Sequence, residues 1–215
     1  MLLITVHGLL GSGAPDIGRQ VADRIRVDYV DREILDNVAL KLSCEEKEIV
    51  EKESPPITLF GRIVVAIKHG LRYGTGSDGA FVPLWQISLD DYSYFQTLEL
   101  VVKEIALGKS LVILGRGSQF ILKDYHQAFH VQIVAPREIR VKRIMENLKL
   151  NQESANEEIT RFDIQSRLFF KRYFHAEAED PNNYDIVINT EHFSPQAAVS
   201  IIVYSLPFKN GKKFS

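Results

Sequence analysis

The chain has 215 residues, of which 45% are hydrophobic and 25% are charged. Both fractions lie near the average for globular proteins, which excludes a disordered chain and a fibrous repeat. A net charge of -2 argues against general attraction to nucleic acid or to an anionic membrane, and the single cysteine, Cys44, excludes an internal disulfide.

The N-terminal segment predicts a buried strand. Leu2–Val6 is a short apolar run that ends at a glycine-rich turn. The run has no basic segment before it and continues into His7, which does not fit a secretory signal peptide. No stretch of the sequence reaches the roughly 20 apolar residues of a membrane span. We therefore expect a cytoplasmic protein.

The first half of the chain predicts two helices and a second strand before the pattern loosens. Pro15 suits the first turn of a helix, Val27–Val30 is typical of a strand, and Asp31 is a candidate cap for the next helix. Between residues 45 and 84 the apolar spacing becomes irregular. We predict an insertion over residues 45–104 in a single domain whose core consists of residues 1–44 and 105–215.

Strand and helix patterns alternate through the second half of the chain. Leu111–Leu114, Val131–Val134 and Asp185–Ile188 are predicted as strands, and helices are predicted to follow Pro136 and Ser194. Residues 151–180 contain a long polar segment with several arginines, which we predict to be a lid rather than a core helix. Such an alternation specifies an α/β fold around a parallel sheet with right-handed crossovers.

Glycines follow the first strand at the spacing of a phosphate-binding loop. Gly8 and Gly13 match the G-x-x-x-x-G of the P-loop, in a strand-to-helix turn where backbone N–H groups and the helix dipole bind anions. The lysine and the Ser/Thr that complete this motif are replaced by Ala14 and Pro15. A tight turn without a ligand is the alternative. We interpret the turn as a nucleotide-phosphate site made by Gly8, Gly11, Ser12, Gly13 and Ala14.

Arginines occupy three later positions of interest. Arg116 follows a predicted strand at the edge where open α/β sheets bind ligands. Arg140 and Arg143 lie on neighbouring turns of one predicted helix, and Arg161 lies in the predicted lid. Positioned arginines can neutralise a phosphoryl group during its transfer. For each of them, a solvated arginine in a turn or on a helix face is the alternative.

The histidines predict neither a metal site nor a hydrolase. Six histidines are scattered along the chain, without an H-E-x-x-H spacing and without a G-x-S-x-G nucleophile elbow. We therefore expect no metal ligands among the side chains.

Several segments together resemble the cytidylate kinase-like family of P-loop nucleoside monophosphate kinases. The resemblance extends over nearly the whole chain apart from residues 45–84, and it depends on the order and spacing of the segments. These segments are Gly11–Gly13 (GSG), Tyr29–Ile34 (YVDREI), Val112–Gly117 (VILGRG), Val134–Met145 (VAPREIRVKRIM) and Tyr184–Thr190 (YDIVINT).

The resemblance implies a three-layer α/β/α P-loop fold with a parallel central sheet, a monophosphate-binding insertion and a helical lid. It implies transfer of phosphate from ATP with Mg2+ to CMP or dCMP, so that small nucleotides are the expected partners. The loop of residues 8–13 would hold the ATP phosphates. The monophosphate would lie at Asp31, Arg32, Arg116 and Gly117, and the catalytic arginines would be Arg140, Arg143 and Arg161.

The predicted lid departs from the family pattern. Cytidylate kinase lids read roughly R-x-D-R-x-R-x-R, whereas residues 161–168 here are RFDIQSRL. Gln165 therefore stands at the position of the acid that reads cytosine, and Leu168 at that of the last arginine. These changes and the incomplete loop support a second hypothesis, in which the chain is a nucleotide-binding or interaction protein derived from a nucleotide kinase with impaired turnover.

Overall fold

The computed structural model describes residues 2–31 and 92–209. The chain divides into two compact units, the first made of residues 1–29 and 110–215 and the second of residues 30–109. The predicted insertion, residues 45–104, falls within the second unit, and the helix predicted to follow Asp31 lies outside the described residues.

A parallel sheet organises the first unit. Its strand order is β2-β3-β1-β4-β5, and β1 pairs in parallel with both β3 and β4. The prediction of an α/β fold around a parallel sheet is confirmed. The strands are β1 (Leu3–Gly8), β2 (Asp28–Val30), β3 (Leu111–Leu114), β4 (Ala128–Val134) and β5 (Ile186–Asn189).

The first strand is longer than the apolar run that predicted it. It continues through His7 to Gly8 because the neighbouring strand β4 pairs with it along its whole length, with Gly8 opposite Ile133. Sheet pairing therefore extends β1 to the first glycine of the predicted loop.

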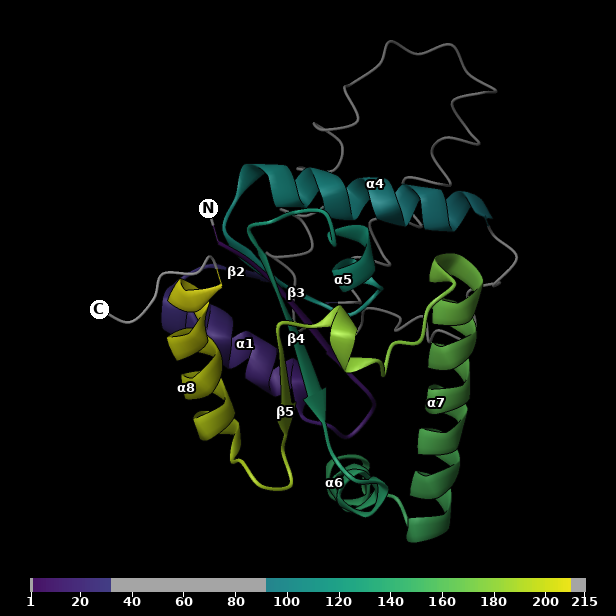
Figure 1. The fold of residues 1–215 in the computed structure, drawn as a ribbon. Helices are drawn as coiled ribbons and strands as arrows, with labels where there is room; N and C mark the ends of the chain where they lie inside the picture. Colours follow the sequence, from purple (N-terminus) through teal and green to yellow (C-terminus); the bar gives the residue numbers. More distant parts are fainter. Residues whose placement is uncertain (1, 32–91, 210–215) are drawn as a thin grey trace, which may run out of the picture. The chain divides into compact units, whose positions relative to one another are not determined.

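Helices connect the strands and cover the sheet. In the first unit, α1 and α8 lie side by side, and α6 packs against α7 (Figure 1). No helix within residues 2–31 and 92–209 is long and apolar enough to cross a membrane. The helices are α1 (Ala14–Ile25), α4 (Tyr92–Gly108, in the second unit), α5 (Ser118–Ile121), α6 (Arg137–Leu148), α7 (Gln152–Phe174) and α8 (Pro195–Ser205), with short 3-10 helices at Pro181–Asn183 and Leu206–Phe208.

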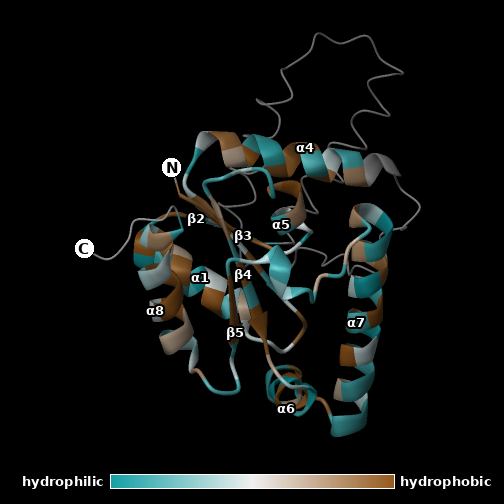
Figure 2. Cartoon of the chain, in the orientation of Figure 1, coloured by the Kyte–Doolittle hydropathy of each residue, from teal (hydrophilic) through white to brown (hydrophobic). Residues whose placement is uncertain are grey.

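The two faces of the sheet differ in chemistry. On the face toward α1 and α8, Ile4, Val6 and residues of β3 and β4 form the apolar core. The opposite face carries buried polar residues. Thr5 and His7 of β1 lie there, paired with His130 and Gln132 of β4. Figure 2 shows the strands as largely hydrophobic. This polar second face is a feature that the sequence pattern did not indicate.

The 23-residue helix α7 is amphipathic. Asn151 caps it by accepting a hydrogen bond from the Ser154 N–H at 2.8 Å. Ala155 and Ile159 of α7 pack with Val141 and Ile144 of α6, so one face of the segment predicted to be a lid is buried. Its opposite face remains open to solvent.

Candidate nucleotide-binding site

The loop between β1 and α1 follows the path that its glycines permit. Gly11 and Gly13 have φ angles of 81° and 90°, in the left-handed region that favours glycine. A Cβ on Gly8 would lie 2.5 Å from the Ser12 Oγ, so this residue must also be small. The sequence therefore predicts the loop because its glycines are sterically required.

Backbone donors of this loop remain available to a ligand. The Ser12 N–H donates to the Leu9 carbonyl at 3.0 Å, and the Ala14 N–H donates to the Ser12 Oγ at a long 3.3 Å. Within residues 2–31 and 92–209, the N–H groups of Gly11 and Gly13 have no protein acceptor. Together with the N-terminus of α1, they form an arrangement that favours an anion.

Arg143 holds the carbonyl side of the loop. Its guanidinium donates to the carbonyls of Gly11 and Ser12, both at 3.1 Å. The same group donates to the hydroxyl and the carbonyl of Thr190, both at 2.8 Å. The Thr190 hydroxyl in turn donates to the Ser12 carbonyl at 2.8 Å. Arg143 and Thr190 thus fix where the loop carbonyls point.

Arg140 connects the loop to α7. Its Nε donates to the Leu10 carbonyl at 2.7 Å. Its two terminal nitrogens form a bidentate pair with the Asp163 carboxylate at 3.0 and 2.6 Å. Both side chains are buried, and a Cβ on Gly11 would lie 2.8 Å from the Arg140 carbonyl. The loop therefore lies directly against α6, and α6 is tied to α7 by a buried ion pair.

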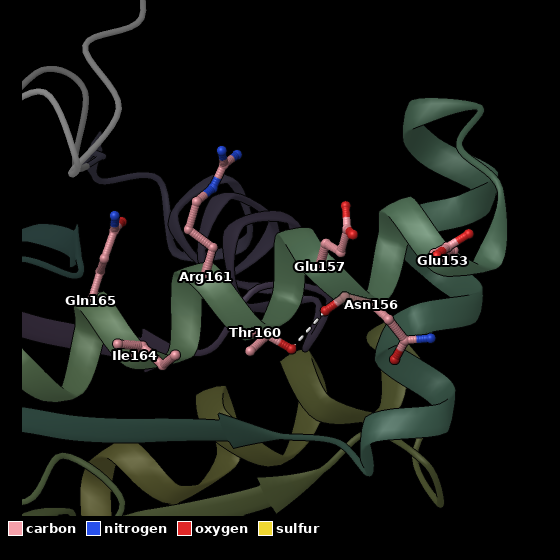
Figure 3. Close-up of a pocket in the computed structure, with 7 residues that line it drawn as sticks. All are labelled: Glu153, Asn156, Glu157, Thr160, Arg161, Ile164 and Gln165. Carbon is pink, nitrogen blue, oxygen red and sulfur yellow. Dashed lines mark hydrogen bonds between the residues drawn. The ribbon is translucent and has the colours of Figure 1, made fainter.

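An open groove of about 670 Å³ follows the exposed face of α7. Two predicted site residues, Arg161 and Gln165, extend from the same side of the helix (Figure 3). Arg161 pairs with Glu158 of the same helix, and this hydrogen bond raises the pKa of the arginine above its ordinary value. The groove is lined by Glu153, Asn156, Glu157, Thr160, Arg161, Ile164 and Gln165.

The turn after β3 has an unusual backbone. Gly115, Arg116 and Gly117 have successive φ angles of 74°, 53° and 70°. Arg116 is only 7% exposed, and its φ lies in the left-handed region that non-glycine residues adopt uncommonly. Phe174 of α7 covers Gly117, where a Cβ would lie 2.3 Å from its ring.

The structure brings some predicted residues together and leaves others apart. The five loop residues, Arg140 and Arg143 form one contiguous cluster, and Arg161 shares the α7 groove with Gln165. Asp31 is partly buried in the second unit, and Arg32 lies outside the described residues. Two residues of the cluster, Asp163 and Thr190, were not selected from the sequence. The sequence offered one signal for Asp163: it is an acidic residue among the arginines of residues 161–172, where it could pair with an arginine.

Comparison with known proteins decides the family. The model of the cytidylate kinase-like family matches residues 3–192. The chain belongs to this family. A cytidylate kinase of Staphylothermus marinus is 26% identical over 209 residues, covering 94% of each chain.

Two solved structures share the fold of this family member. An uncharacterized protein from Eubacterium ventriosum superposes with a TM-score of 0.69 at 17% identity, covering 97% of this chain and 99% of the other. The YorR protein of Bacillus subtilis, solved in complex with phosphorylated GDP, superposes with a TM-score of 0.52 at 9% identity, covering 99% of each chain.

The family assignment gives the loop a chemical meaning. In a P-loop kinase the backbone N–H groups at the start of the first helix bind nucleotide phosphates. In this family member, the fully buried Ala14 occupies the position of the lysine that adds a positive charge in complete loops. Pro15 supplies neither the hydroxyl that binds Mg2+ in complete loops nor an N–H group. The loop thus fits a phosphate through its backbone but does not fit a loop-bound Mg2+.

Proposed function

We propose that the protein transfers a phosphoryl group from ATP to a nucleoside monophosphate, most specifically CMP or dCMP. The observation that carries this proposal is the loop of residues 8–13, whose carbonyls are held by arginines while the N–H groups of Gly11 and Gly13 remain available. Family membership and the relative from Staphylothermus marinus support a cytidine nucleotide as the acceptor.

The chain's own residues divide the work of an in-line transfer. The loop binds the ATP phosphates through backbone donors. Arg161, exposed in the α7 groove, neutralises the charge that develops on the transferring group. Arg140 and Arg143, the other two proposed catalytic arginines, act through the loop that they position. Arg116 and Gly117 bind the acceptor monophosphate, and Gln165 contacts its base.

A specific observation favours a second candidate function, a nucleotide-binding protein with impaired turnover. Arg140 is already committed to Asp163 and to the Leu10 carbonyl, so its charge is neutralised by a buried carboxylate. Arg161, which lines the α7 groove, is itself paired with Glu158, and position 14 supplies no lysine. This candidate predicts that ATP binds with little or no ADP release.

The test is a measurement of ADP release with CMP, dCMP, UMP or AMP as acceptor, and without any acceptor. Calorimetric titration of ATP accompanies it. We expect ADP release that depends on CMP or dCMP. We also expect Arg161→Gln to reduce kcat at least tenfold, because one positioned charge is worth several kcal/mol in the transition state. The matched control is Arg24→Gln, the same change of charge on an exposed residue of α1.

The outcomes separate the two candidates. ATP binding without acceptor-dependent ADP release overturns the kinase proposal and supports the nucleotide-binding protein. Equal loss of activity in Arg161→Gln and Arg24→Gln contradicts the role of Arg161.

A further inference from the structure

A group of buried polar residues lies on the polar face of the sheet, opposite the face that packs against α1 and α8. It is next to the loop of residues 8–13, the phosphate loop. His7 directly precedes Gly8 and is 6% exposed. Its ring stacks on Tyr184, with centroids 6.1 Å apart and planes 17° apart, and meets the edge of Phe170 at 5.1 Å. Ser118 and Gln119, in the turn of α5 that follows Arg116, are 0% and 2% exposed.

Within the described part of the chain, each of these three residues has one polar side-chain atom without a hydrogen-bond partner. Among residues 2–31 and 92–209, the His7 Nε2, the Ser118 Oγ and the Gln119 Oε1 are the buried side-chain atoms in this state. Buried polar groups are nearly always hydrogen-bonded, and an isolated exception requires an explanation. Three exceptions at the carboxyl ends of neighbouring strands point to a ligand that supplies the missing partners.

The surrounding hydrogen bonds define what Gln119 requires. The Tyr184 hydroxyl donates to the Ala178 carbonyl at 2.6 Å, so it accepts from the Gln119 Nε2 at 3.2 Å. This bond fixes the amide orientation and leaves the Oε1 as an acceptor that needs a donor. The Ser118 hydroxyl can donate or accept, and the imidazole of His7 can do either according to its tautomer.

The charge of a ligand group decides whether it can pair with the three unpartnered atoms. Burial lowers the pKa of His7 to about 4, so its ring is neutral at pH 7. A phosphate or carboxylate oxygen cannot donate to the Gln119 Oε1. An ammonium ion would be buried among neutral groups without a counter-charge, which is costly. A hydroxyl both donates and accepts, and is uncharged.

We propose that His7, Ser118 and Gln119 form a subsite for a sugar hydroxyl of the phosphoryl acceptor. This inference rests on the proposed kinase function and deepens it, because it makes these three residues determinants of the acceptor's sugar. Arg116, the arginine proposed to bind the acceptor phosphate, lies between β3 and Ser118 and is therefore close to the subsite in the chain.

The decisive variant is Ser118→Ala, which removes one of the unpartnered atoms and breaks no hydrogen bond among residues 2–31 and 92–209. Calorimetry in the presence of a non-hydrolysable ATP analogue measures the affinities for CMP, 2′-deoxy-CMP and 3′-deoxy-CMP. We expect the wild type to bind one of the deoxy analogues roughly tenfold more weakly than CMP. Ser118→Ala should lose this discrimination and bind CMP roughly tenfold more weakly, while its Tm stays equal or rises.

The matched control is Thr5→Val on the same face of the sheet. The Thr5 hydroxyl is already paired with the His130 Nδ1 at 2.7 Å. Its removal should lower the Tm and leave the CMP affinity unchanged. The two variants therefore give opposite patterns of stability and affinity.

Three results overturn the subsite. Unchanged CMP affinity in Ser118→Ala indicates that the unpartnered atoms hold internal water only. A Tm lowered by several degrees in Ser118→Ala shows that the hydroxyl serves the fold. Equal binding of all three monophosphates by the wild type shows that no sugar hydroxyl is recognised. In these cases CMP-dependent ADP release can persist, whereas a wild type that binds no monophosphate overturns the kinase proposal together with the subsite.

Discussion

The phosphate loop and the polar group around His7 are adjacent in the chain and differ in how their polar atoms are satisfied. Carbonyls of the loop accept hydrogen bonds from Arg140, Arg143 and Thr190. On the other side of Gly8, atoms of His7, Ser118 and Gln119 lack partners within the part of the chain that the structure describes. The protein has fixed one region in advance and left hydrogen-bonding capacity unused in the other.

This contrast matches what the two proposed ligand groups, a nucleotide phosphate and a sugar hydroxyl, would bring to the site. A triphosphate carries strong charge and needs donors held in place before it arrives, because reorganising them during the reaction is costly. A neutral hydroxyl gains little from fixed charge but gains specificity when its absence leaves buried polar atoms unpaired.

The largest effect is expected from Asp163→Ala. The change leaves the Arg140 guanidinium buried without its carboxylate, and breaking such a pair typically costs about 3–5 kcal/mol. Urea denaturation measures the free energy of unfolding. The control is Glu158→Ala, which removes the partially exposed partner of Arg161 and should cost about 1 kcal/mol or less. Equal losses in both variants would show that the Asp163 pair is not the fixing element.

Acid should weaken the His7 region next. Burial lowers the pKa of His7 from 6.5 to about 4, so the unfolded chain binds a proton at a pH where the folded chain does not. The contribution of His7 to the free energy of unfolding is therefore fully present above pH 6.5. It falls by about 3 kcal/mol as the pH drops toward 4. His130 has the same direction, with its pKa lowered to about 4 chiefly by burial.

His7→Phe isolates the contribution of His7 to this pH dependence. Denaturation curves at pH 7, 6, 5 and 4 should fall less steeply for the variant than for the wild type, because one buried base has been removed. Parallel profiles for the two proteins would contradict the assignment.

Two glycines of the loop allow a finer test of the fixed region. Gly13→Ala should cost about 1–2 kcal/mol, since the new Cβ meets nothing closer than 3.8 Å and only the left-handed φ opposes it. Gly11→Ala should cost about 3 kcal/mol, because its Cβ also meets the backbone of Arg140. Thermal melts measure the difference. A larger loss for Gly13→Ala would show that the loop does not depend on its contact with α6.

Local signals in the sequence were sufficient for most of the fold. The apolar run Leu111–Leu114 forms β3, and the Ser194–Pro195 signal begins α8, where the Ser194 hydroxyl accepts from the Ala197 N–H at 3.2 Å. Both depend on residues within a few positions of each other. The short helix α5 was missed, because four residues after a glycine turn leave no helical period to detect.

The candidate site was predictable only in part. The glycines predict the loop because they are required sterically. The contacts of Arg140 and Arg143 could not be predicted, because they depend on residues up to 132 positions away. The sequence suggested arginines that face a ligand, whereas the structure shows that they hold loop carbonyls. The unpartnered atoms of Ser118 and Gln119 had no signal at all, because burial and pairing are properties of the packed fold.

The smallest expected effect concerns the gap left in the loop by Pro15. Serine at this position restores a backbone N–H and a hydroxyl at the first turn of α1, without disturbing the fully buried Ala14. We expect Pro15→Ser to raise ATP affinity about fivefold, because one added donor to a phosphate is worth roughly 1 kcal/mol or more. Calorimetric titration with ATP measures the change.

The chain offers a matched control for this last variant in Pro195→Ser, the same substitution in the first turn of α8. Both prolines contribute a fixed φ at the start of a helix, so both variants should lose a similar small amount of stability. Only Pro15→Ser should change the ATP affinity, because only α1 begins at the phosphate loop. If neither variant changes it, the donors of Gly11 and Gly13 already satisfy the phosphate, and the loop is complete without its Ser/Thr. A gain confined to Pro15→Ser shows instead that the fixed region still has room for one more donor, and that the missing hydroxyl position limits how tightly this family member holds ATP.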